Sequence, residues 1–128
     1  ACAFLNAEGR CSIHPHRPGI CRLFPLGRYY EENGFRYFLQ VHECQKENRA
    51  KVKVKKWLDT PDLKKYETYI ARWHGLLIQL QEFIAAHPES AKAVSMDVLQ
   101  RFYLTPYQTE EFYSEFFQRM DEAKKAYC

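Results

Sequence analysis

The sequence predicts an α+β protein that is mainly α. An irregular, cysteine-rich N-terminal segment with a small β-hairpin precedes a long helix and a C-terminal helical bundle. Four of the five cysteines lie between Cys2 and Cys44, among glycines and prolines. Asn33-Gly34 separates two strand-like runs, and apolar residues recur at helical spacing after Pro61. Hydrophobic residues make up 46% of the 128 positions, which is enough for one compact domain with a real core.

The cysteine-rich segment needs a constraint that its own backbone does not supply. Its glycines and prolines leave few regular hydrogen bonds and few contiguous apolar residues. Thiolates gathered on a metal would supply this constraint. The cysteines that we assign as metal ligands are Cys2, Cys11, Cys21 and Cys44. Their spacing contains no C-x-x-C, so spacing alone leaves disulfides and buried free thiols open. An odd cysteine count argues against a secreted disulfide scaffold, and Cys128 is expected to be a free thiol.

Two arginines flank Cys21 in the sequence, and we assign both to cofactor binding. The charges of Arg17 and Arg22 would lower the pKa of a nearby thiol, and their donors would tune a thiolate cluster. The alternative is that these arginines only pin the loop. His14 and His16 are ligands by chemistry, but we interpret them as polar loop residues because nothing in the sequence fixes their geometry.

The string Arg17-Pro18-Gly19-Ile20-Cys21-Arg22-Leu23-Phe24-Pro25 resembles a specific motif, R-P-x-x-C-R-x-F-P, of the YkgJ-type cysteine-cluster family. Gly9-Arg10-Cys11-Ser12-Ile13 and the later Phe112-Tyr113-x-x-Phe116 extend the resemblance towards longer bacterial members. Proteins of that family are described as zinc- or iron-chelating, or as iron–sulfur proteins. The resemblance therefore implies a zinc ion or an iron–sulfur cluster on the four cysteines, and leaves the choice between them undecided.

One departure from the family bears on the ligand set. The family usually has a further C-x-x-C-C group well upstream, and this chain begins at Ala1 without it. We therefore expect the chain to be part of a longer protein, with some ligands in the missing N-terminal part.

Residues Arg28 to Val41 predict the β-hairpin. Asn33-Gly34 is a strong short turn signal. After this turn signal, residues of one set alternate with those of another, as in a strand: Phe35, Tyr37, Leu39 and Val41 against Arg36, Phe38, Gln40 and His42. This hairpin is expected to bring Cys44 back towards Cys21.

The basic run from Arg49 to Lys56 predicts a short strand with Val52 and Val54 inward. The lysines that we expect to be surface charges are Lys51, Lys53, Lys55 and Lys56. A basic run beside Trp57 could instead bind nucleic acid. We do not favour that interpretation, because 19 basic and 16 acidic residues give a net charge of only +3.

A long helix is predicted from Leu63 to Ile84, capped by Asp59 or Thr60 and ended by His87-Pro88. Its expected buried stripe is Leu63, Tyr66, Ile70, Trp73, Leu77, Leu80 and Ile84. The spacing alternates between three and four residues.

Two shorter helices are expected to complete the bundle. The first is capped by Ser95 and runs to about Tyr103, with Val98, Leu99 and Phe102 inward. The second starts at a Thr109 cap, and its stripe is Phe112, Phe116, Met120, Ala123 and Tyr127. We accordingly divide the chain into a cysteine-rich, metal- or cluster-binding subdomain (1–56) and a helical subdomain (57–128) within one compact domain.

The motifs of several enzyme classes are missing from the sequence. It has no phosphate-binding glycine loop, dinucleotide fingerprint, G-x-S-x-G elbow or H-E-x-x-H helix. We expect a cytoplasmic metal-binding protein that does not bind membranes, with an unknown protein partner. A cluster-dependent redox or modifying enzyme is the first alternative. A nucleic-acid or protein interaction module is the second.

Overall fold

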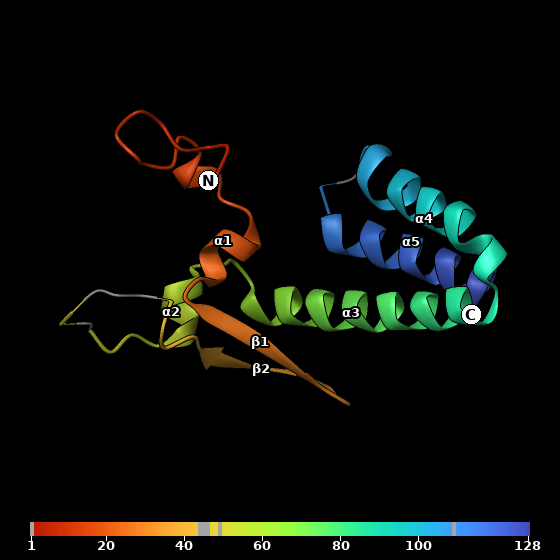
Figure 1. Ribbon diagram of the computed structural model, residues 1–128, viewed down its shortest axis with the longest axis horizontal. Coiled ribbons are helices and arrows are strands. Elements are labelled where there is room, and N and C mark those ends of the chain that lie inside the picture. Colours follow the sequence, from red (N-terminus) through yellow and green to blue (C-terminus); the bar gives the residue numbers. More distant parts are fainter. Residues whose placement is uncertain (1, 44–46, 49, 109) are drawn as a thin grey trace. The chain divides into compact units, whose positions relative to one another are not determined.

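The computed structural model describes residues 2–43, 47–48, 50–108 and 110–128. The chain forms two compact units, Ala1–Pro61 and Asp62–Cys128 (Figure 1). The mainly helical α+β class is confirmed: the first unit contains a two-stranded antiparallel sheet, and long helices form the second. The subdomain division at residue 56 stays a prediction.

The first unit joins short helical turns to the hairpin. Its elements, in chain order, are η1 (His14–His16), α1 (Gly19–Leu23), β1 (Leu26–Glu31), β2 (Gly34–Leu39) and α2 (Val54–Leu58). The predicted hairpin is confirmed, with pairs from Leu26↔Leu39 to Glu31↔Gly34. The two turn residues are Glu32 and Asn33, so Gly34 begins β2 rather than completing the turn. Its φ of 132° is one that glycine adopts without strain.

The strand predicted from Arg49 to Lys56 is wrong. The helix α2 starts at Val54, and Val52 is 45% exposed rather than inward. Val54 and Leu58 are four residues apart and share one face of α2, where Leu58 is buried to 1% exposure. The segment packs against α1, and the helical spacing of four residues explains this contact where the alternation of a strand does not. Arg49 lies outside the described residues, and the four lysines of the run are exposed, as expected.

The second unit is helical throughout its regular part. Its elements are α3 (Leu63–Ala86), η2 (Pro88–Ser90), α4 (Ala91–Leu99), the π-helical turn η3 (Gln100–Leu104) and α5 (Phe112–Tyr127). The long helix is confirmed, but the cap was assigned wrongly. Asp62 is the N-cap and accepts a hydrogen bond from the Lys65 amide at 3.3 Å. Asp59 instead ends α2 as its C-cap residue, three positions before the Asp62 cap.

The helices α3, α4 and α5 pack side by side (Figure 1). Aromatic pairs show that α5 runs parallel to α3, because Tyr69 meets Phe116 near the start of both helices and Phe83 meets Tyr127 near their ends. The core residues are Leu76, Leu80, Val94, Phe102, Phe116, Met120 and Ala123.

The buried stripe of α3 is offset from the predicted one. Leu76 is fully buried, whereas Leu77 is half-buried, and Tyr69 and Phe83 pack against the core. Trp73 and Ile84 of the predicted stripe also pack against the core, as expected. Spacings of three and four residues fit either stripe, so periodicity alone could not decide between adjacent leucines. The predicted burial of Leu80 is confirmed.

The helix α4 starts at Ala91, four residues before the predicted Ser95 cap, so the buried Val94 was missed. Phe102 is buried as expected, but Leu99 is 41% exposed and its assignment to the interior was wrong. In α5 the expected burial of Phe116, Met120 and Ala123 is confirmed. The predicted Thr109 cap lies outside the described residues.

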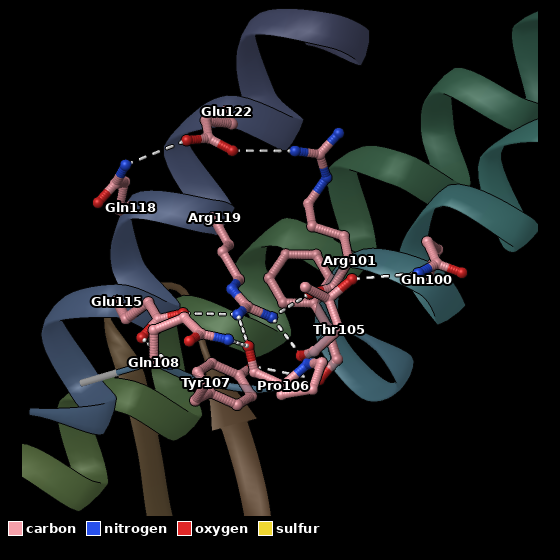
Figure 2. A network of polar contacts seen from close by, with 11 residues as sticks. Gln100, Arg101, Thr105, Pro106, Tyr107, Gln108, Glu115, Gln118, Arg119 and Glu122 are labelled. Atoms are coloured by element: carbon pink, nitrogen blue, oxygen red, sulfur yellow. Dashed lines mark hydrogen bonds and ion pairs between the residues drawn. The ribbon is translucent and has the colours of Figure 1, made fainter. Parts of the chain in front are cut away.

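A buried arginine closes the end of the π-helical turn (Figure 2). Arg119 is 8% exposed and lies over the Tyr107 ring, with its guanidinium carbon 4.0 Å from the ring centroid. Its Nη1 donates to the Arg101 and Thr105 carbonyls at 2.6 and 2.9 Å. Its Nη2 donates to the Pro106 carbonyl at 2.8 Å and to Glu115 Oε1 at 2.6 Å. One side chain thereby satisfies three carbonyls at a helix end, where backbone partners run out.

Candidate metal-binding segment

The first two cysteines border a closed loop. The Asn6 amide donates to the Arg10 carbonyl at 2.8 Å, and the Arg10 amide donates to Asn6 Oδ1 at 2.8 Å. The Gly9 amide closes a turn by donating to the Asn6 carbonyl at 3.0 Å, and Gly9 occupies the left-handed region at φ 71°, which glycine adopts without strain. Beyond this turn, Leu5 and Cys11 form an antiparallel bridge. The local sequence thus fixes the backbone between Cys2 and Cys11.

The third cysteine lies on α1. Pro18 begins this helix as its N-cap residue, and the Cys21 amide donates to the Pro18 carbonyl at 2.9 Å. Leu23 is buried at 4% exposure and anchors the helix, whereas Cys21 is exposed. The Phe24 carbonyl, at the end of the motif, accepts a hydrogen bond from Trp57 Nε1 at 3.1 Å. The motif therefore presents its thiol on a short helix held through its neighbours.

The two predicted cofactor-binding arginines bond to the backbone around α1. Arg22 donates from Nε to the Arg17 carbonyl (3.3 Å), from Nη1 to the Asp59 carbonyl (3.0 Å) and from Nη2 to the Pro15 carbonyl (3.4 Å). Arg17 Nε donates to the His14 carbonyl at 3.1 Å. These contacts are the loop-pinning role that we set out as the alternative. A direct role towards a metal or cluster stays a prediction.

The described cysteines are free thiols with different exposure. Cys2 and Cys21 are exposed, Cys11 is half-buried, and Cys128 is exposed at the end of α5. Cys44, the fourth predicted ligand, lies outside the described residues. Across the described part of the chain, no three histidine, cysteine, aspartate or glutamate side chains gather closely enough to hold a metal ion. The structure therefore does not bring Cys2, Cys11 and Cys21 together, and the four-cysteine site stays a prediction.

Two histidines of this segment were considered as metal ligands. His14 and His16 form the exposed turn η1, which fits their interpretation as polar loop residues. Sequence reasoning missed the anchoring contribution of Trp57 and of the Asp59 backbone to α1. Trp57 is 47% exposed, and an indole N–H requires a protein partner chiefly when it is buried, so the sequence carried no clear signal for this contact.

The donor chemistry of this segment suits zinc or iron. Thiolate sulfur is a ligand both of zinc and of the iron in iron–sulfur clusters. Cys2, Cys11 and Cys21 are free thiols within the first unit, so each can supply such a ligand. The spread of the described thiols means that a bound metal would have to draw the segment together.

Residues 1–50 match the sequence model of the CxxCxxCC family, described as a "putative zinc- or iron-chelating domain". No curated protein and no solved structure gives a significant match to the chain. No helix within the described residues has the length and apolar character needed to cross a membrane. The matched residues contain Cys2, Cys11, Cys21 and Cys44. The resemblance to the cysteine-cluster family is thereby confirmed over residues 1–50.

Proposed function

We propose that this chain is a metal-binding protein of the YkgJ-like type, whose clustered cysteines hold zinc or an iron–sulfur cluster. The ligands in this proposal are Cys2, Cys11, Cys21 and Cys44. The observation that carries it is the family match over residues 1–50, because that segment contains all four of these cysteines and excludes Cys128.

The shortage of core in the first unit supports the proposal. Among its described residues, only Leu23 and Leu58 are buried hydrophobic side chains. A metal bound by separated thiols would order the segment, so its binding free energy would also be folding free energy. Because ligand thiols must lose their protons, metal affinity should rise with pH.

We further propose that the protein works in the cytoplasm. Free thiols persist in reducing compartments, and the four described cysteines are all free. This setting also suits thiolate ligands, which oxidation to disulfides would remove.

The test is metal analysis with an absorption spectrum on chain purified without oxygen. An iron–sulfur cluster should give iron, sulfide and visible absorption, whereas zinc should give a colourless protein with stoichiometric zinc. Replacing Cys11 and Cys21 with serine should abolish metal retention, because each substitution removes a thiolate ligand.

Cys128→Ser is the matched control, since it removes a free thiol from the second unit. It should leave the metal content unchanged. Metal retained by the double variant, or lost equally in the Cys128 variant, would contradict the proposal.

A further inference from the structure

A cation-lined hollow lies at the junction of α1 and α2, outside the cysteine ligand set. Its volume is about 530 Å³, within the range of small-molecule sites. It is lined by Arg22, Lys55, Lys56, Asp59, Thr60 and Pro61, all from the first unit.

The positive charges of this hollow lack carboxylate partners. Arg22, Lys55 and Lys56 form no ion pair within the described part of the chain, and the one acidic lining residue, Asp59, is not within ion-pair distance of them. By contrast, several other cations, including Arg101 and Arg119, are paired with carboxylates. Three cations against one carboxylate leave the hollow with a formal charge of +2. Such a concave surface attracts anions.

Arg22 is held in place before any ligand arrives. Three of its five N–H groups donate to the carbonyls of Pro15, Arg17 and Asp59, which leaves two N–H groups for an oxyanion. Since the backbone already fixes this side chain, a ligand would pay less ordering entropy to bind it.

The ordinary explanation accounts for only part of this cluster. Lys55 and Lys56 lie in the last turn of α2, where cations favour the helix dipole. That explanation does not apply to Arg22. This residue belongs to α1, lies 33 positions before Lys55 in the sequence, and still lines the same hollow.

We propose that this hollow binds the phosphate groups of a small phosphorylated molecule. A guanidinium fork with two ammonium groups suits an oxyanion that carries more than one negative charge. No cysteine of the proposed ligand set lines the hollow, so phosphate binding can be tested on protein with or without metal.

The test is calorimetric titration of the chain with pyrophosphate at physiological salt. The Lys55→Gln/Lys56→Gln variant should weaken binding by about tenfold or more, because it removes two charged donors. The matched control is Lys51→Gln/Lys53→Gln, which removes the same charge from exposed lysines that do not line the hollow. That control should change affinity by less than about twofold.

A second measurement does not depend on any variant. Pyrophosphate should shift the amide resonances of residues 55–60 in the unmodified chain, and leave those of residues 4–12 in place. Shifts spread evenly over both segments, no saturable binding, or equal weakening by the two double variants would overturn the proposal. So would tighter binding of a single-stranded oligonucleotide that both variants weaken equally, because that result assigns the basic surface to nucleic acid.

The metal content of the Lys55/Lys56 variant separates this inference from the proposed function. Unchanged metal with weakened pyrophosphate binding supports a separate phosphate site. Metal loss together with weakened pyrophosphate binding would overturn the proposal of a separate phosphate site. In that case the two lysines would affect pyrophosphate binding by supporting the cysteine segment.

Discussion

The second unit has a hydrophobic core of its own, whereas the first buries only Leu23 and Leu58 among its described hydrophobic residues. In the second unit, aromatic rings around Trp73 and Phe116 extend the core to its edges. In the first, hydrogen bonds to loop carbonyls and a two-stranded hairpin provide most of the constraint. A two-stranded hairpin is marginally stable alone. The comparison indicates that the first unit needs a further stabilising interaction, for which a metal is our proposal.

Each unit also has an arginine that donates hydrogen bonds to backbone carbonyls, and the two arginines differ in burial. Arg22 and Arg119 both donate to three carbonyls. Arg119 is buried and is paired with Glu115 at 2.6 Å. Arg22 is half-buried, has no carboxylate partner in the described chain and faces an open hollow. The buried arginine therefore completes a closed network, while the other keeps donors for a ligand.

The largest effect is expected at the buried arginine. Arg119→Met should lower the free energy of unfolding of the second unit by about 3–5 kcal/mol, because it removes the partner of a largely buried carboxylate and the donor to three carbonyls. Hydrogen exchange resolved by residue should show the loss of protection in α4 and α5, with residues 4–12 unchanged. Equal loss in both units would remove the distinction between them.

Lys65→Met is the control for charge loss in the same unit. Lys65 is 56% exposed in its side chain and pairs with Asp62 and Glu111 only at 3.8 and 3.9 Å. This substitution should cost about 0–1 kcal/mol. A cost similar to that of Arg119→Met would show that burial does not set the difference.

The next effect concerns which leucine of α3 contacts the core. Leu76→Ala should cost about 2–5 kcal/mol, since the side chain is fully buried and leaves a cavity. Leu77→Ala, one residue further along, should cost less than about 1.5 kcal/mol because that side chain is half-buried. Urea denaturation of both variants measures the difference. The reverse order would restore the stripe predicted from the sequence.

Long-range periodicity and strong turn signals predicted the parts of the fold that depend on local sequence. The spacing of apolar residues gave the extent of α3 and the buried face of α5, and Asn33-Gly34 gave the hairpin. The errors arose where contacts between residues far apart in the sequence determine the secondary structure or the buried face. Packing of α2 on α1 made Val54 helical, and choosing Leu76 over Leu77 required the positions of α4 and α5.

The candidate site was predictable as a set of residues but not as a geometry. The motif around Cys21 identified the family segment, which the match over residues 1–50 confirms. Spacing cannot show whether Cys2, Cys11 and Cys21 converge, because loop paths between them depend on contacts such as the Arg22 bonds to distant carbonyls. Arg119 had one sequence signal, a Glu115–Arg119 pair four residues apart beside the apolar stripe of α5.

The smallest effect is expected at alkaline pH. Burial, followed by the nearby Tyr103, raises the pKa of Tyr69 from 10.0 to about 12. The folded state therefore keeps this proton at pH values where the unfolded chain has released it. The stabilising contribution is complete below about pH 10 and falls as the pH rises towards 12. Burial also raises the pKa values of Tyr107 and Tyr113 in the same unit.

Tyr69→Phe should therefore reduce the loss of stability between neutral pH and about pH 11, without removing it, since the other buried tyrosines still titrate. The ring contact with Phe116, at 4.7 Å between centroids, survives this substitution, so stability at neutral pH should change little. Urea midpoints at the two pH values measure the effect, with Tyr29→Phe as an exposed control in the first unit. An identical alkaline loss in the Tyr69 variant and the unmodified chain would mean that this buried hydroxyl does not govern the high-pH stability of the second unit. The alkaline contrast between the two units would then have to come from the remaining tyrosines.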